Sequence, residues 1–212
     1  MTRLTKDELD EISRTTLEHY DCNARAFWEG TRDHDVSQNI EALLEAIPGE
    51  GRFRVLDLGC GLGRDLLALC KRAHHPIGLD GAETFVAMAR EVASVEVWHQ
   101  DLLALDLPDS DFDGVFANAS LFHVPAHELP RVFREVNACL RPGGVLFSSN
   151  PRERNEEGWG GSRYGAYHDL GRWRDFALGA GFEEIRHYYR PSGLPREQQR
   201  WLASRWRRPA EP

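Results

Sequence analysis

Three glycines between a short apolar segment and a helical segment constrain the fold of this chain most. The segment 55–65 reads VLDLGCGLGRD, with Gly59, Gly61 and Gly63 at every second position. Glycine permits a tight backbone turn and lets a ligand lie against bare main chain. The first turn of the following helix leaves backbone N–H groups free for a carboxylate or phosphate. A strand, a glycine loop and a helix in this order predict the opening unit of a nucleotide-binding α/β fold.

Short apolar runs alternate with helical segments after this loop. The runs that we expect to form strands are 54–60, 77–80, 95–101, 113–120 and 144–150, with helices expected at 63–73, 82–92 and 126–140. Strands that are buried on both faces read as near-continuous apolar runs, as these do. The alternation therefore predicts a parallel sheet with helices on both faces.

The regions on either side of this alternating pattern have a different arrangement of apolar and polar residues. Helical spacing is weak over 7–19 and clear from Ser37 to Ile47, with Ser37 as the expected cap. Residues 151–168 have no long apolar run and contain four glycines, which favours a long ordered loop. A helix at 169–179 and two last strands, 182–190 and 201–207, are expected after it.

Acidic residues stand at the ends of the second and third expected strands. Asp80 lies 17 residues past Gly63 and suits a carboxylate that accepts hydrogen bonds from both ribose hydroxyls. Asp101 is placed to meet an adenine amino group, with Leu102 beside the ring. Ligands of open α/β sheets bind in the crevice at these strand ends. A dinucleotide site would need G-x-G-x-x-G, so an NAD(P)-dependent oxidoreductase is the weaker alternative, and a non-catalytic nucleotide-binding module is another.

These elements together resemble the class I S-adenosylmethionine (SAM) dependent methyltransferases. The resemblance covers about 52–150 and rests on DLGCGLG, Asp80, the sequence Gln100-Asp101-Leu102 and the LRPGG turn before the fifth strand. It implies a Rossmann-like α/β fold with a seven-stranded, mostly parallel sheet flanked by helices, an N-terminal helical lid, and SAM as the cofactor. The expected cofactor contacts are Tyr20, Phe27, Asp57, Gly59, Gly61, Arg64, Asp80, Gly81, Asp101, Leu102 and Asn118.

Four longer segments resemble the methyltransferase region of ovothiol synthases. They are YDCNARAFWEGTRDHDVSQN, FDGVFANASLFHVPAHELPRV, LFSSNPRERNEEGWGGSRYGAYHDL and HYYRPSGLPREQQRWLASRWRR, and the resemblance spans about 18–208. It implies methylation of the imidazole π nitrogen of 5-thiohistidine to give ovothiol A. The alternative is a class I methyltransferase acting on another small histidine derivative or on a thiol.

Members of this family commonly carry an iron-dependent sulfoxide synthase region ahead of the methyltransferase. The 212 residues cannot hold both. We therefore expect a stand-alone methyltransferase or an excised domain, working with a separate or fused sulfoxide synthase. The expected organisation is a single domain over 1–212, with a helical lid segment at 1–50, a SAM-binding core at 51–150, and a substrate loop and the last two strands at 151–212.

Methylation of a ring nitrogen needs tight control of the substrate, because a thiolate is a better nucleophile than a neutral imidazole. Several polar contacts must turn the sulfur away from the methyl group. We expect Asn118 and His123 to be catalytic, with His123 accepting the proton that the ring loses. An arginine of the loop can clamp the amino-acid carboxylate, and Arg190 can close the same pocket. The expected substrate contacts are Asp33, Asn118, His123, Asn150, Arg152, Tyr164, Tyr167 and His168.

Composition excludes several other classes of protein. The formal net charge is −8, which disfavours nucleic acid or an anionic membrane as a partner and leaves a small molecule. No apolar run approaches the roughly 20 residues of a transmembrane helix, and no signal peptide is expected. The four cysteines form no CxxC pair, so no metal site is expected. These features predict a cytoplasmic protein.

Overall fold

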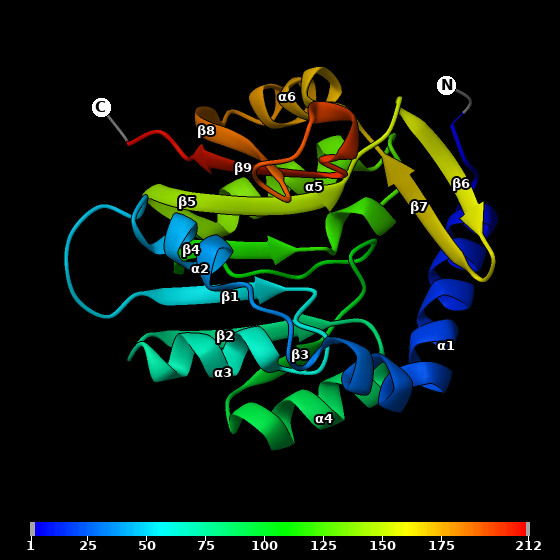
Figure 1. The fold of residues 1–212 in the computed structure, drawn as a ribbon, viewed down its shortest axis with the longest axis horizontal. Coiled ribbons are helices and arrows are strands. Elements are labelled where there is room, and N and C mark those ends of the chain that lie inside the picture. Colours follow the sequence, from blue (N-terminus) through cyan, green and yellow to red (C-terminus); the bar gives the residue numbers. More distant parts are fainter. Residues whose placement is uncertain (1–2, 211–212) are drawn as a thin grey trace.

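The computed structural model describes residues 3–210 and is built around a seven-stranded sheet (Figure 1). The strands lie in the order β3-β2-β1-β4-β5-β9-β8. They are β1 (Arg54–Leu58), β2 (His75–Asp80), β3 (Val97–His99), β4 (Phe112–Asn118), β5 (Leu140–Pro151), β8 (Glu183–Arg190) and β9 (Trp201–Arg207). Neighbours among β1 to β5 are parallel, and β9 is antiparallel to both β5 and β8. The expected Rossmann-like, mostly parallel sheet is confirmed.

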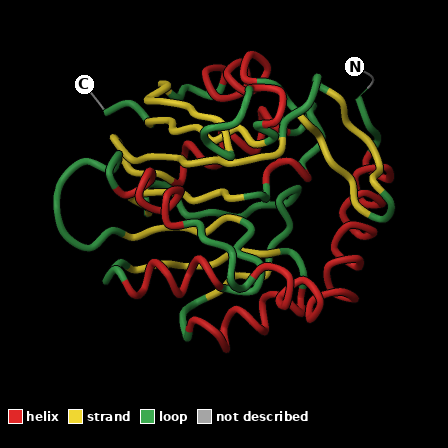
Figure 2. The backbone as a smooth tube through the Cα atoms, viewed as in Figure 1, coloured by secondary structure: helices red, strands yellow, loops and turns green. Residues whose placement is uncertain are grey.

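Helices cover both faces of this sheet, as Figure 2 shows. They are α2 (Ser37–Leu44), α3 (Arg64–Lys71), α4 (Glu83–Ala93), α5 (Leu129–Cys139) and α6 (Leu170–Gly179). Successive strand residues point to opposite faces. Leu56 and Val115 accordingly pack in the cluster that contains α5 and α6, whereas Val55 and Phe116 pack with α2. Helix α3 packs on the same face of the sheet as α2, and α4 packs beside α3.

A long helix and a hairpin lie beside the ends of the central strands (Figure 1). Helix α1 (Lys6–Thr31) begins with a capping box, in which Thr5 and Glu8 bond each other's backbone N–H groups. The hairpin consists of β6 (Glu156–Gly160) and β7 (Arg163–Tyr167). It is fixed to α1 where the Tyr164 backbone N–H donates to Thr16 Oγ1, at 3.1 Å. This arrangement positions both elements over the glycine loop end of the sheet.

Three local expectations were wrong. The loop expected at 151–168 contains the β6–β7 hairpin, whose glycine-rich strands lack an alternating apolar pattern. The helix expected at 7–19 continues to Thr31 and includes Gly30, because its C-terminal turns pack against the body of the protein. Ser37 is the first residue of α2 and not its cap; its backbone N–H donates to Asp35 Oδ1.

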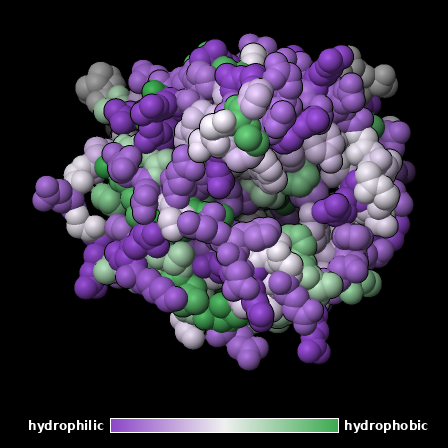
Figure 3. All heavy atoms as spheres, viewed as in Figure 1, coloured by the Kyte–Doolittle hydropathy of each residue, from purple (hydrophilic) through white to green (hydrophobic). Residues whose placement is uncertain are grey.

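Hydrophilic side chains cover most of the face in Figure 3, with smaller hydrophobic areas among them. Within residues 3–210, no helix is both long enough and apolar enough to cross a membrane.

Candidate active site

A cavity of about 970 Å³ lies beside α1 at the carboxyl ends of β1, β2 and β4. This volume is typical of a site that encloses one or two small molecules. The glycine loop and the ends of β2 and β4 line one part of it. Other parts are lined by α1, the connection between α1 and α2, the segment after β3, the short 3-10 helix η1 (Leu121–His123), the β6–β7 hairpin and the β8–β9 connection.

Backbone hydrogen bonds and close packing hold the glycine loop in shape. The N–H groups of Gly59 and Cys60 donate to the Leu79 carbonyl at 2.8 and 3.0 Å. Gly59 has φ +80°, and a Cβ there would lie 2.3 Å from Ser120 Cβ. Gly61 has φ +54°, and a Cβ added to Gly61 would have only Phe85 within 4 Å. The bare backbone of Gly61 therefore faces the cavity. This bare backbone is the kind of surface that an adenosyl cofactor needs.

The two predicted carboxylates both line the cavity. Asp80 accepts hydrogen bonds from the backbone N–H groups of Gly61 and Ala82, at 2.9 and 3.0 Å. Burial raises the pKa of Asp80 to about 6. Asp101 accepts from the Leu103 N–H at 2.8 Å and from the hydroxyl of Ser13 on α1. Both carboxylates are held rigidly with acceptor capacity left over, which fits the hydroxyl and amino groups of an adenosine.

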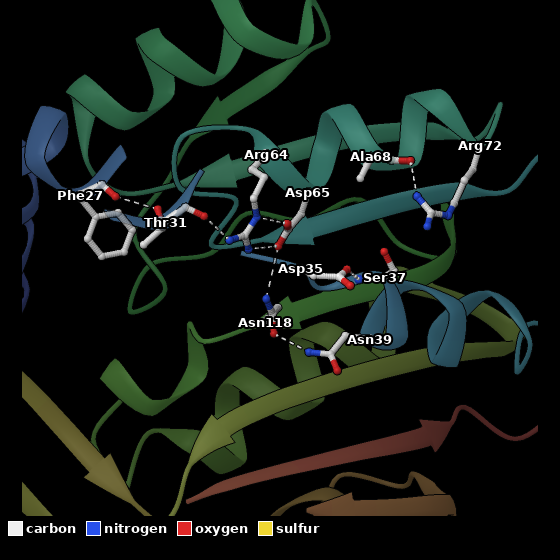
Figure 4. A network of polar contacts seen from close by, with 10 residues as sticks. All are labelled: Phe27, Thr31, Asp35, Ser37, Asn39, Arg64, Asp65, Ala68, Arg72 and Asn118. Carbon is white, nitrogen blue, oxygen red and sulfur yellow. Dashed lines mark hydrogen bonds and ion pairs between the residues drawn. The ribbon is translucent and has the colours of Figure 1, made fainter. Parts of the chain in front are cut away.

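A chain of polar contacts joins the helices beneath the cavity (Figure 4). The Arg64 guanidinium donates to both oxygens of Asp65, at 2.7 and 3.1 Å, and to the Thr31 carbonyl at the end of α1, at 2.9 Å. Asn118 donates to Asp65 at 3.3 Å and accepts from Asn39 at 3.0 Å. Arg64 and Asn118 line the cavity as expected, but protein groups already hold their polar atoms.

Loss of the Arg64 side chain is expected to loosen the end of α1. An Arg64→Gln variant leaves Asp65 without its cation and leaves the Thr31 carbonyl with the His34 backbone N–H as its remaining donor. We expect the free energy of unfolding to fall by about 1–3 kcal/mol, measured by urea denaturation, with faster amide exchange at the C-terminal turn of α1. Arg25→Gln is the matched control, because the Arg25 side chain is 91% exposed. Equal exchange at that turn in Arg64→Gln and wild type would contradict the prediction.

His123 and Tyr20 form a hydrogen-bonded pair in the cavity wall. Tyr20 Oη lies 2.7 Å from His123 Nε2, and His123 Nδ1 lies 2.6 Å from the Tyr164 carbonyl oxygen. Burial lowers the pKa of His123 to about 4, so the ring is neutral at physiological pH. A histidine with this pKa is a weak proton acceptor. The geometry therefore favours a role for His123 other than the general base expected from the sequence.

Six of the predicted site residues lie outside the cavity wall: Asp33, Asp57, Asn150, Arg152, Tyr164 and His168. Asp33 is exposed beside Arg32. The Arg152 guanidinium donates to the carbonyls of Gln199 and Arg196 and lies over the Tyr189 ring, so it holds the β8–β9 connection.

The other four of these residues are buried behind the wall. Asp57 lies under the glycine loop, where burial and then the charge of Asp65 raise its pKa well above the usual range. His168 packs against Trp173 and Phe176. Asn150 is buried in β5. The ring of Tyr164 is turned toward Trp159, and it is the carbonyl of Tyr164 that reaches His123.

Several residues of the cavity wall were missed from the sequence. Helix α1 contributes a stripe at helical spacing, in which the predicted Tyr20 and Phe27 are joined by Ile12, Ser13, Thr16, Leu17, Trp28 and Thr31. Its signal was the i, i+3, i+4 spacing that continues past residue 19. Asp65 was also missed, and nothing local indicates its contact with Asn118. Of the predicted substrate residues, Asn118, His123 and Tyr167 line the cavity.

Comparisons with known proteins agree with this geometry. Residues 55–144 match a family model described as a methyltransferase domain. The chain is 36% identical over 129 residues to trans-aconitate 2-methyltransferase of Variovorax paradoxus, an alignment that covers 58% of this chain and 48% of that protein. It is 29% identical over 213 residues to ubiquinone biosynthesis O-methyltransferase of Alkalilimnicola ehrlichii, covering 91% and 81%. The chain spans about half the length of the trans-aconitate relatives that it matches.

Solved structures share this fold over most of the chain. The 1,6-didemethyltoxoflavin-N1-methyltransferase of Burkholderia thailandensis, with bound 1,6-didemethyltoxoflavin and S-adenosylhomocysteine, has a TM-score of 0.76 and 18% identity, covering 99% of this chain and 92% of that chain. A SAM-dependent methyltransferase of Mesorhizobium loti has a TM-score of 0.65 and 22% identity, covering 79% and 96%.

The fold places a bare glycine loop after β1, Asp80 at the end of β2 and Asp101 just after β3, which gives a cavity suited to an adenosyl group. Together with the matches, it makes the chain similar to SAM-dependent methyltransferases, with residues 55–144 matching a methyltransferase domain.

Proposed function

We propose that this enzyme methylates the imidazole π nitrogen of 5-thiohistidine, giving ovothiol A. The observation that carries this proposal is the placement of the four segments that resemble ovothiol synthases. Each of them contributes residues to the cavity wall, and three of them lie mostly or wholly outside the matched domain, residues 55–144. The contributors include Tyr20, Phe27, Trp28, Phe122, His123, Arg163, Tyr167, Arg190 and Trp201. The resemblance therefore concerns the residues that would select a substrate.

In this proposal the cofactor lies along the glycine loop. Asp80 holds the ribose hydroxyls, Asp101 and Leu102 contact the adenine, and the Gly61 backbone faces the methionine part. S-adenosylmethionine supplies a methyl group that is already activated on a positively charged sulfur. The protein therefore has to orient the acceptor and exclude water. The lid at 1–50, the core at 51–150 and the substrate part at 151–212 belong to the same proposal, as does a separate or fused sulfoxide synthase that supplies the thiol.

Two arginines suit the carboxylate of an amino-acid substrate. Arg163 and Arg190 line the cavity from the hairpin and from the end of β8. Among residues 3–210, neither guanidinium forms an ion pair with an Asp or Glu side chain, in contrast to Arg64. A guanidinium with free donors binds a carboxylate through two parallel hydrogen bonds. The aromatic residues around them offer an apolar surface for the imidazole ring.

The proposal is tested by incubating the protein with SAM and 5-thiohistidine and locating the added methyl by mass spectrometry and NMR. Histidine, ergothioneine and trans-aconitate serve as competing acceptors. Methylation of the 5-thiohistidine π nitrogen with the highest kcat/KM is expected. Preferential methylation of sulfur, or of another acceptor in this set, would overturn the proposal in favour of a different class I substrate.

Loss of either free guanidinium is expected to weaken substrate binding. Arg163→Gln and Arg190→Gln should each raise KM for 5-thiohistidine by about tenfold, because a charge-assisted hydrogen bond to the carboxylate is lost. The affinity for SAM should stay within about twofold of wild type. Arg152→Gln is the matched control, since that guanidinium is bonded to carbonyl groups outside the cavity. An unchanged KM in both cavity variants would contradict carboxylate recognition at this place.

A further inference from the structure

We propose that Tyr20 and His123 together form a fixed hydrogen-bond acceptor that receives an N–H of the substrate ring, so that the other ring nitrogen faces the methyl group. This inference rests on the proposed function and deepens it. It makes Tyr20 a substrate-orienting residue where the sequence indicated a cofactor contact. It also gives His123 the task of orienting the Tyr20 hydroxyl, in place of accepting a proton.

The first step is the protonation state of His123. Its Nδ1 lies 2.6 Å from the Tyr164 carbonyl oxygen, which can only accept a hydrogen bond. Nδ1 therefore carries the proton. With a pKa of about 4, the ring holds only this proton at neutral pH. Nε2 is left with a free lone pair. The Tyr164 carbonyl is itself well placed, because the N–H of the same residue is anchored on Thr16 of α1 at 3.1 Å.

The second step is the direction of the Tyr20 hydroxyl. Tyr20 Oη lies 2.7 Å from the Nε2 lone pair, so the single hydroxyl hydrogen donates to His123. Burial raises the pKa of Tyr20, and the nearby Arg163 offsets this only in part, so the phenol keeps its hydrogen. The Tyr20 oxygen can then act only as an acceptor toward any further partner.

The third step is the surroundings of this acceptor. The Tyr20 ring contacts the edges or faces of Phe27 and Phe85, with centroid separations of 5.6 and 5.4 Å. Phe122 packs on the His123 ring at 3.9 Å. The Arg163 guanidinium lies 5.9 Å from the centre of the Tyr20 ring and also donates to the Tyr20 oxygen, so a substrate N–H shares this acceptor with Arg163. A hydrogen bond in a buried wall of this kind is stronger than one in water.

The acceptor selects one tautomer of the substrate imidazole. The two nitrogens of an imidazole point in diverging directions, so an N–H held at Tyr20 directs the lone pair of the other nitrogen away from it. In the transfer, the bond between the methyl carbon and the sulfonium sulfur breaks, and a bond forms from the nitrogen lone pair to that carbon. The positive charge passes to the ring, where the substrate thiolate balances it. The ring N–H stays in place, so this step needs no base.

The tautomer of His123 can be measured in the free protein. NMR of protein with ¹⁵N-labelled histidine is expected to show His123 with a protonated Nδ1 and a bare Nε2, without titration between about pH 6 and 9. A protonated Nε2 in the free protein would overturn the proposal, because Tyr20 would then have to accept from His123. This readout needs no substrate, so it stands even if the proposed substrate is wrong.

The role of the Tyr20 hydroxyl is tested with Tyr20→Phe. The kcat/KM for 5-thiohistidine should fall by about tenfold or more, and part of the methyl should move to the second ring nitrogen. The affinity for SAM, measured by calorimetry without substrate, should stay within about twofold. Tyr189→Phe is the matched control, because that tyrosine lies outside the cavity under Arg152 and Arg196.

Other outcomes separate the explanations. A loss of SAM affinity in Tyr20→Phe as large as the loss of kcat/KM would mean that Tyr20 contacts the cofactor, and would overturn the proposal. Unchanged regiochemistry together with an unchanged kcat/KM would also overturn it. A wild-type protein that does not methylate 5-thiohistidine refutes the proposed function. In that case, the affinity for imidazole is measured on the complex with S-adenosylhomocysteine. A lower affinity in Tyr20→Phe, with no change in Tyr189→Phe, would still support the acceptor. Equal affinities of the two variants would overturn it.

Discussion

Replacing Gly59 with alanine is expected to abolish measurable SAM binding and to lower the free energy of unfolding by about 2–5 kcal/mol. Gly59 has φ +80°, a conformation that strains an alanine, and the added Cβ would lie 2.3 Å from Ser120 Cβ. Relief of this clash must move the loop away from Ser120, whose hydroxyl donates to the Leu58 carbonyl at 2.6 Å. Urea denaturation and calorimetry with SAM give the two readouts.

Gly179→Ala provides the matched control for this variant. Gly179 is the last residue of α6, it has no atom within 4 Å of an added Cβ, and its φ does not lie in the left-handed region. Alanine there should leave SAM affinity unchanged and raise stability by up to about 1 kcal/mol. A Gly59→Ala protein that binds SAM as tightly as Gly179→Ala would refute the assignment of this loop to the cofactor.

Removal of the Asp80 carboxylate is expected to weaken SAM binding by about 100-fold or more. The buried carboxylate is already fixed by two backbone N–H groups, so its remaining lone pairs meet the ribose without reorganisation. Asp80→Ala should show this loss by calorimetry at neutral pH. The matched control is Asp33→Ala, since Asp33 is exposed and lies outside the cavity. Comparable affinities of the two variants would contradict the ribose assignment.

The raised pKa of Asp80 also gives a pH dependence with a definite sign. Hydroxyl donors favour the ionised carboxylate, so the affinity of the wild-type protein for SAM should rise with pH through about 6 and be lost as pH falls below it. The contribution of Asp80 to the stability of the free protein has the opposite sign. Folding raises this pKa above the ordinary value of 3.8 for an aspartate, so that contribution falls as pH rises from about 4 to 6. Asp80→Ala should lack the Asp80 contribution to both trends.

Periodicity was sufficient for the central sheet because its strands are buried on both faces. Runs such as 113–120 and 144–150 have apolar centres, VFA and VLF, so their positions are visible in the sequence. The ends of parallel strands meet at one edge, so the carboxylates Asp80 and Asp101 could be assigned to the same cavity from their position alone.

Contacts between segments that are far apart in the sequence could not be predicted from hydrophobic periodicity. The β6–β7 hairpin is stabilised by α1, through Thr16, and not by an alternating pattern of its own. Arg64 was expected to contact the cofactor, but its guanidinium donates to the Thr31 carbonyl, which lies 33 residues earlier in the sequence. The weak basicity of His123 depends on burial and on the Tyr164 carbonyl, neither of which a local pattern encodes.

Helix α1 also sets the length of the cavity. Ser13 touches Asp101 at the expected adenine end, and the Thr31 carbonyl is held by Arg64. These two points are 18 residues apart, about 27 Å along a helix. One inserted or deleted residue between them would turn everything beyond it by about 100° and carry Tyr20 or Thr31 off the shared stripe. Evolution can therefore vary the side chains of this helix far more freely than its residue count.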